Sequence, residues 1–431
     1  MADFPSTIDL SESGASVIIQ GDVAGDKAGW SVSEAGDVNG DGIGDFILGA
    51  IDAGSSGKAY VIFGKQGGLS NIDLANPLAA DAGFAITGDA AGDKVGFSVS
   101  GGGDYNGDGF DDLVVGAAEA DSSTSDYGEV YVVFGKASGF ATVDLGGADP
   151  GNDFIRVTGD NEGDKLGTSV SFAGDVNADG RDDLVLGAPF SDADTYNGGA
   201  AYVIFGQAEG NETDRNLGTA LAAGDGFVIA ESSPGSYDQF GGSVSGAGDL
   251  NGDGFDDFIV GAFQADFTDS DRGAAYVFFG AANPAGVTML TIRGDASGDL
   301  LGKSVSGAGD VNGDGFGDLI VGAYGGDDGG TGAGEAYVIF GKASGWTNPI
   351  DLSAPLAAAD GFQIIGSIAD DRLSSGVSSA GDVNGDGFDD VIVGAVFHDN
   401  GEPDFDDRDS GAAYVIFGKA DGFGTIDLDV P

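Results

Sequence analysis

Aspartate, asparagine and glycine recur in a nine-residue phrase, D-x-N-x-D-G-x-x-D, that this 431-residue sequence repeats six times. Oxygen-bearing side chains stand at positions 1, 3, 5 and 9, and a glycine stands at position 6 in every copy. Calcium binds roughly six to eight oxygens from carboxylates, amides and backbone carbonyls, and it tolerates irregular geometry. The glycine permits the sharp turn that brings positions 1, 5 and 9 together. The phrase therefore predicts six calcium loops.

The predicted ligands of each loop are the side chains at positions 1, 3, 5 and 9, with the backbone carbonyl of position 7 as a fifth contributor. In chain order these residues are Asp37, Asn39, Asp41, Ile43 and Asp45; Asp104, Asn106, Asp108, Phe110 and Asp112; Asp175, Asn177, Asp179, Arg181 and Asp183; Asp249, Asn251, Asp253, Phe255 and Asp257; Asp310, Asn312, Asp314, Phe316 and Asp318; Asp382, Asn384, Asp386, Phe388 and Asp390. Without a metal ion, the three carboxylates of each loop would repel one another.

Three other interpretations of this phrase are a bare hairpin turn, an EF-hand and a magnesium site. A bare hairpin turn is the simplest, since Asp-Gly is a turn signal by itself, but a turn does not require oxygens at four positions in all six copies. An EF-hand requires a glutamate at position 12 and flanking helices. Position 12 is instead apolar in every copy, namely Leu48, Val115, Leu186, Val260, Val321 and Val393. Magnesium prefers a stricter octahedron and retains its waters, so calcium is favoured.

A second phrase, YV(I/V/F)FG, alternates with the acidic phrase and indicates β-strands. It begins at Tyr60, Tyr131, Tyr202, Tyr276, Tyr337 and Tyr414. The apolar runs are short, rich in Val, Ile, Phe and Tyr, and bounded by Gly, Asp and Asn, without helical periodicity. In the second repeat they cover residues 96–100, 112–117, 129–135 and 153–159, which predicts four strands per repeat. Each acidic phrase then lies between two strands.

Runs such as AYVIFG are apolar on both faces, which suits strands that lie between neighbouring sheets. Repeated four-stranded sheets predict an all-β fold, a β-propeller with six four-stranded antiparallel blades. A linear β-solenoid is the alternative, but its coils are usually shorter and lack long loops that recur at one place. We expect a single propeller domain over residues 1–431, with blades over approximately 22–88, 89–159, 160–230, 231–294, 295–366, and 367–431 plus 1–21.

The two ends of the sequence predict how the ring of blades closes. The last repeat stops at TIDLDVP, without the outer strand that follows IDL elsewhere. Val17–Gly21 (VIIQG) aligns with Phe84–Gly88 (FAITG), which is the outer strand of the first repeat. We therefore expect the N-terminal strand to complete the last blade and to remove its exposed edge.

Composition and charge narrow the classes of partner. Hydrophobic residues make up 41% of the sequence, so the 83 glycines indicate neither disorder nor collagen. The 16 basic and 72 acidic residues give a formal net charge of −56, which disfavours nucleic acid and anionic membrane surfaces. Cysteine is absent, which excludes disulfides and thiolate metal sites. The sequence has neither an apolar run of about 18 residues nor a leader pattern, so we expect no membrane insertion, and either a larger parent polypeptide or another export route.

These motifs resemble the FG-GAP repeats of the integrin alpha-subunit propeller, across essentially the whole chain. In LGTSVSFAGDVNADGRDDLVLGAP, residues 166–189, the strand, the acidic loop and Gly-Ala-Pro stand in the family order. The sequence departs from the family pattern because Gly-Ala-Pro is complete only at residues 187–189, and the phenylalanine before the glycine survives only at Phe240. The family's propeller has seven blades, whereas we predict six here.

The resemblance implies that the calcium loops lie on one face, and that ligands are met on the other face by the loops joining strands two and three and by the connections between blades. In this sequence the strand two to three loops are the variable segments 50–57, 119–128, 190–199, 263–273, 324–334 and 397–411. A recognition face would use their aromatic residues, Phe190, Tyr196, Phe263, Phe267, Phe397 and Phe405. The alternative is a set of solvated acidic loops.

The function expected from these features is binding: a secreted or cell-surface module for an extracellular protein or glycan, acting as a monomer or as part of a larger polypeptide. A secreted hydrolase or lyase is the second class, but no acidic pair stands out as general acid and base, and we predict no catalytic residue. A calcium-rigidified spacer is the third. The single histidine, His398, cannot form a usual zinc site and is expected in a loop. Trp30 and Trp346 could stack on sugar, although packing is favoured.

Overall fold

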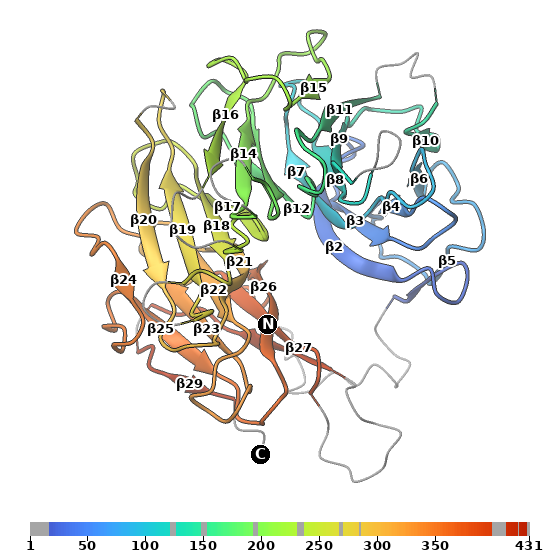
Figure 1. Cartoon of the computed structure of the whole chain (residues 1–431). Coiled ribbons are helices and arrows are strands. Elements are labelled where there is room, and N and C mark those ends of the chain that lie inside the picture. The colour runs from blue at the N-terminus through green and yellow to red at the C-terminus, as the bar shows by residue number, and fades with distance from the viewer. Residues whose placement is uncertain are drawn as a thin grey trace. The chain divides into compact units, whose positions relative to one another are not determined.

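The computed structural model describes residues 17–120, 126–147, 153–192, 197–230, 237–266, 270–283, 286–398, 411–420 and 422–428 of the chain (Figure 1). Across these ranges every regular element is a β-strand, with no α-helix, so the predicted all-β class is confirmed. The same ranges accordingly hold no helix with the length and apolar character needed to cross a membrane.

The repeating unit is a sheet of short antiparallel strands. In the second repeat these are β7 (Ser98–Gly103), β8 (Asp112–Ala117), β9 (Glu129–Val133) and β11 (Phe154–Thr158). They pair in the order β11-β9-β8-β7, with Val115 of β8 opposite both Val99 and Tyr131. The acidic phrase forms the turn between β7 and β8, as the sequence predicts.

The other repeats follow the same order. The first sheet contains β2 (Ala28–Gly36), β3 (Asp45–Ala50), β4 (Lys58–Ile62) and β6 (Gly83–Thr87). The third contains β12 (Ser169–Gly174), β13 (Asp183–Ala188), β14 (Ala200–Ile204) and β16 (Gly226–Ala230), and the fourth β17 (Ser243–Gly248), β18 (Asp257–Ala262), β19 (Ala274–Phe279) and β20 (Thr288–Arg293). The fifth contains β21 (Leu301–Gly309), β22 (Asp318–Ala323), β23 (Glu335–Ile339) and β25 (Gly361–Ile365), and the sixth β26 (Leu373–Gly381), β27 (Asp390–Ala395) and β28 (Ala412–Ile416). These six sheets confirm the six blades.

A further short strand from the following repeat pairs in parallel with the outer strand, which the sequence analysis did not predict. These pairs are β5 (Ile72–Asp73) with β1 (Ile19–Gln20), β10 (Val143–Asp144) with β6, β15 (Arg215–Asn216) with β11, β24 (Ile350–Asp351) with β20, and β29 (Ile426–Asp427) with β25. Strand β1 thus pairs with a short parallel strand, as the outer strands of the other blades do. The prediction that β1 completes the sixth blade requires it to pair with β28. Among the described pairs β1 joins β5 and β28 joins β27, so this closure stays a prediction.

The second strand of a blade is largely buried. All six residues of β8, and all six of β18, are buried, since sheets pack against both of their faces. A glycine in this strand admits the neighbouring backbone. A Cβ placed on Gly116 would lie 2.2 Å from the carbonyl oxygen of Gly167, and one on Gly261 would lie 2.0 Å from that of Gly302. This close approach explains the glycine of the Gly-Ala phrase.

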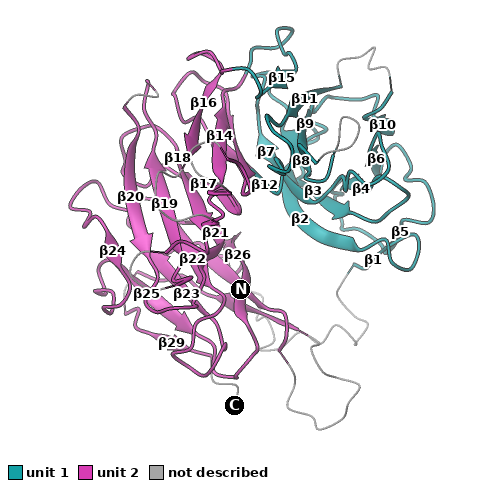
Figure 2. Cartoon of the chain, in the orientation of Figure 1, with its two compact units in different colours: residues 1–170, 207–219 teal, residues 171–206, 220–431 magenta. Residues whose placement is uncertain are grey.

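Two compact units divide the chain, residues 1–170 with 207–219 and residues 171–206 with 220–431 (Figure 2). The first two sheets belong to the first unit, and the fourth, fifth and sixth sheets belong to the second. A single domain with the predicted blade boundaries stays a prediction.

Candidate metal centres

The acidic phrases form six turns, named here loops 1 to 6, over residues 37–45, 104–112, 175–183, 249–257, 310–318 and 382–390. The first aspartate organises each turn through its own side chain. In loop 2, Asp104 Oδ1 accepts hydrogen bonds from the N–H groups of Gly107 and Asp108, at 2.7 and 3.0 Å. Its Oδ2 accepts from Gly109 at 2.9 Å, and Gly109 has a φ of 89°, which favours glycine.

The aspartate at position 9 connects the loop to the third strand of its blade. Asp112 is fully buried. Its Oδ2 accepts from the N–H of Tyr105 at 3.0 Å, and its Oδ1 accepts from the N–H of Gly135, the glycine of the YVxFG phrase, at 2.8 Å. The same two bonds recur at Asp45, Asp183, Asp257, Asp318 and Asp390. Position 9 therefore holds the fold together whether or not it binds metal.

Burial makes the charge of these carboxylates costly. It raises the pKa of Asp112 and Asp183 to about 8 in each case, and the nearby aspartates at positions 5 and 1 add to the rise. The backbone N–H donors act in the opposite direction but do not cancel it. For Asp257 and Asp318, burial raises the pKa to about 7. A bound cation would reverse this effect, because it favours the ionised carboxylate.

The side-chain oxygen of the asparagine at position 3 indicates whether the loops suit a cation, because an oxygen without a hydrogen-bond donor is available as a ligand. In loop 2, Asn106 Oδ1 accepts from the N–H of Asp108 at 2.9 Å. Asn251 Oδ1 and Asn384 Oδ1, in loops 4 and 6, are buried and lack a hydrogen-bond donor among the described residues. Two orphaned amide oxygens beside carboxylates fit a hard cation that binds only oxygen. The residues present therefore fit calcium.

The loops do not bring their carboxylate oxygens into a tight cluster. Within the described ranges, the only three acidic side chains whose oxygens lie within 4.8 Å of one another are Asp295, Asp328 and Glu335, outside the loops. At positions 1, 5 and 9 the oxygens are instead held by backbone N–H groups, such as Asp108 Oδ1 by Phe110 at 2.9 Å. The six predicted sites stay predictions.

Position 8 carries a function that the sequence analysis missed. Asp256 Oδ2 accepts a hydrogen bond from the N–H of Asp175, the first residue of the preceding loop, at 2.8 Å. Asp389 accepts from Asp310 in the same way, also at 2.8 Å. These bonds join adjacent loops, and the Asp-Asp pair at positions 8 and 9 was the available signal.

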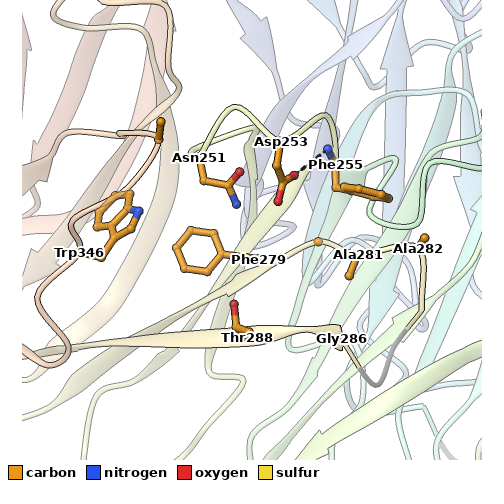
Figure 3. A pocket seen from close by; sticks show the side chains of 11 residues that line it. Asn251, Asp253, Phe255, Phe279, Ala281, Ala282, Gly286, Thr288 and Trp346 are labelled. Atoms are coloured by element: carbon orange, nitrogen blue, oxygen red, sulfur yellow. Dashed lines mark hydrogen bonds between the residues drawn. The ribbon is translucent and has the colours of Figure 1, made fainter.

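A cavity of about 650 Å³ borders loop 4 (Figure 3). Its lining includes Asn251, Asp253 and Phe255 of the loop, together with Phe279 and Trp346. The rings of Phe279 and Trp346 lie 5.8 Å apart and are tilted by 50°, and both pack on the core. Trp346 therefore has the packing role that the sequence analysis favoured, and it lines the same cavity as the loop.

The predicted recognition residues are partly described. Phe190 and Phe263 are half-buried, and Phe397 is exposed. Lys303 Nζ lies 4.0 Å from the ring centroid of Phe263. The other three predicted residues, Tyr196, Phe267 and Phe405, lie outside the described residues.

His398 was expected to be a loop residue, and the structure gives it a specific contact. Its side chain is buried, and its Nδ1 lies 2.6 Å from Asp371 Oδ2. Asp371 precedes the first strand of the sixth blade, so this contact ties that segment to the end of the turn after β27. This buried contact therefore has a structural role, since it joins two segments of the sixth blade.

Comparison with protein families identifies five repeats. The model of the FG-GAP repeat matches residues 95–133, 166–204, 240–278, 302–339 and 376–416. Each matched segment contains an acidic loop and the strands that flank it. The first blade has the same elements but lies outside the matched segments.

The chain is similar to parts of integrin alpha subunits. The chain is 30% identical to integrin alpha pat-2 of Caenorhabditis elegans over 251 residues, which is 54% of this chain and 18% of that protein. It is 30% identical to integrin alpha-5 of Xenopus laevis over 236 residues, which is 52% of this chain and 19% of that protein. It is 32% identical to integrin alpha-PS2 of Drosophila melanogaster over 185 residues, 40% of this chain and 12% of that protein. The matched region is thus less than a fifth of each relative.

Proposed function

Because this chain is an FG-GAP repeat β-propeller similar to those of integrin alpha subunits, we propose that it is a calcium-stabilised module that binds an extracellular protein or glycan. The six loops bind structural calcium, and the loops joining the second and third strands meet the ligand. It works at a cell surface or after secretion. The chain acts by binding and not as an enzyme.

The observation that carries the calcium proposal is the arrangement at position 9. Six fully or almost fully buried aspartates, including Asp112 and Asp183, occupy equivalent positions beside two further loop aspartates. Burial raises their pKa, so in the metal-free loop these carboxyl groups tend to keep a proton at neutral pH. Calcium held by the side chains at positions 1, 3, 5 and 9 takes the place of that proton.

The expected affinity supports an extracellular location. Calcium modules outside cells typically have dissociation constants of about 10⁻⁴–10⁻³ M, and sites that weak stay largely empty in a cytosol. The net charge of −56 also favours basic ligands and opposes nucleic acid.

Trp346 offers a direct test, since it lines one cavity with Asn251 and Asp253 of loop 4. The sequence has two tryptophans, so Trp30→Phe leaves Trp346 as the single fluorescent reporter. Calcium added to the chelated variant should change its emission saturably. Asp253→Asn, in loop 4, should abolish that change, whereas Asp386→Asn, in loop 6, should preserve it. No spectral change, together with no calcium uptake by calorimetry, would overturn the proposal.

The ligand is tested by screening the calcium-loaded chain against immobilised glycans and extracellular-matrix proteins. Saturable binding should weaken in Phe397→Ala and persist in Trp346→Phe, because Phe397 belongs to a strand two to three loop and Trp346 does not. Chemical turnover of a glycan or protein probe would favour a secreted hydrolase or lyase. Absence of both binding and turnover would favour a calcium-rigidified spacer without a specific ligand.

A further inference from the structure

A second group of acids lies outside the six loops, at the fifth blade. It consists of Asp295 in the turn after β20, Asp328 in the loop between β22 and β23, and Glu335 at the start of β23. One oxygen of each residue lies within 4.8 Å of the other two. Oxygens at this separation can share one calcium ion at about 2.3–2.6 Å from each. The three segments are brought together only by the fold.

The group contains buried oxygen that hydrogen bonds do not satisfy. Asp295 Oδ1 is closed to water and has no hydrogen-bond donor among the described residues. Glu335 is only 1% exposed. A buried carboxylate oxygen that neither a donor nor water reaches requires a proton or a cation.

The hydrogen-bond donors around the group are uncharged. Glu335 accepts from the Tyr337 hydroxyl and from the N–H of Asp328, each at 2.8 Å. Gln363 Nε2 donates to Asp328 Oδ2 at 2.9 Å and to Glu335 Oε2 at 3.2 Å. Asp299, itself 2% exposed, adds a fourth acid in contact with Asp295. Four carboxyl groups are therefore crowded together here without a described basic partner.

The second blade provides an internal comparison. Its Glu129 begins the third strand as Glu335 does, and it too accepts from a tyrosine two residues later. Arg156 stands opposite Tyr131 in that sheet, where Gln363 stands opposite Tyr337 in the fifth. Arg156 Nη1 lies 3.6 Å from Glu129 and 3.9 Å from Asp89. A guanidinium thus neutralises the acids of the second blade, and the fifth blade has glutamine in its place.

We propose that a calcium ion, held by the carboxylates of Asp295, Asp328 and Glu335, occupies in the fifth blade the place that the Arg156 guanidinium occupies in the second. The ligands are all oxygens, as a hard cation prefers. The ion ties the turn after β20 to the loop between β22 and β23, and so orders a strand two to three loop. This site does not depend on the six acidic loops.

Gln363→Arg is the decisive variant, because it introduces into the fifth blade the guanidinium that Arg156 supplies at the equivalent position of the second blade. The guanidinium should neutralise the acids and displace the ion without unfolding the chain. Equilibrium dialysis against calcium, followed by metal analysis, should find one calcium fewer per chain than in the wild type. Glu129→Gln, at the arginine-neutralised site, should leave the calcium content unchanged.

An unchanged calcium content in folded Gln363→Arg would overturn the proposal. If circular dichroism finds that variant unfolded, Asp328→Asn replaces it, because this side chain is exposed. It too should lose one calcium, and an unchanged content would again refute the site. If the six loops bind nothing, the wild type should hold one calcium and Gln363→Arg none, so failure of the proposed function is distinguishable.

Discussion

Asp112 Oδ1 accepts a hydrogen bond from the backbone N–H of Gly135 at 2.8 Å, across 23 residues of sequence. The bond connects the end of an acidic loop to the glycine of the YVxFG phrase. Equivalent bonds occur in the other five blades. The two repeated phrases are therefore one structural unit, and the last aspartate of each loop belongs to the core as well as to a candidate metal site.

The double role of Asp112 predicts different effects for two loop substitutions. Asp112→Ala should lower the free energy of unfolding by at least about 2 kcal/mol, since the N–H groups of Tyr105 and Gly135 lose their acceptor and each unsatisfied buried donor costs roughly 1–3 kcal/mol. Asp108→Ala should change it by less than about 1 kcal/mol, because its bond to Phe110 is more exposed. Urea unfolding with chelator present measures both without a contribution from calcium. Equal effects would contradict the double role.

Calcium removal should destabilise the chain. A site that binds only the folded form adds about 2.7 kcal/mol when calcium is a hundredfold above its dissociation constant, so several independent sites rival the stability of a domain. Differential scanning calorimetry should find a much lower melting temperature in chelator than in millimolar calcium. Magnesium at equal ionic strength is the control for non-specific screening, and it should restore little. A melting temperature indifferent to chelator would refute structural calcium.

The raised pKa values predict an unusual pH dependence for the metal-free chain. Asp112, Asp183, Asp257 and Asp318 have folded-state pKa values of about 7 to 8, so the folded chain holds protons that the unfolded chain releases near pH 4. Their favourable contribution is complete below about pH 4 and is lost as pH rises through 7 to 8. In chelator, the free energy of unfolding should therefore fall as the pH rises from about 4 to 8. The same measurement on Asp112→Asn gives the pH dependence that is due to the other acids. With calcium the dependence should weaken or reverse, because protons compete with the metal.

The close approach of adjacent sheets predicts a severe effect for one methyl group. Gly261→Ala would place a Cβ 2.0 Å from the carbonyl oxygen of Gly302, so we expect a loss of several kcal/mol or failure to fold. Gly44→Ala is the matched control, since nothing lies within 4 Å of its Cβ position. It should leave the unfolding midpoint nearly unchanged. Comparable midpoints for the two variants would show that the sheets separate more easily than described.

The repeats, the strands and the loops were predictable because their signals are local. Nine residues contain all the side chains of loop 2, from Asp104 to Asp112, and short apolar runs mark the strands that flank it. The parallel strand β10 was not predictable in the same way. It is two residues long, Val143–Asp144, and it forms only because β6 of the preceding repeat offers an edge.

The sequence by itself determined the all-β class, the six blades and the oxygen-rich chemistry of the loops, because residue type and short spacing are sufficient for each. Only the tertiary structure decided which aspartates are buried, that Asp256 reaches the preceding loop, and that Asp295, Asp328 and Glu335 meet. Asp295 follows the outer strand of the fourth sheet, whereas Asp328 and Glu335 belong to the fifth sheet, so the approach of Asp295 to the other two depends on how these sheets pack. Packing is a long-range property, and no local spacing encodes the distance between carboxylates that two sheets bring together.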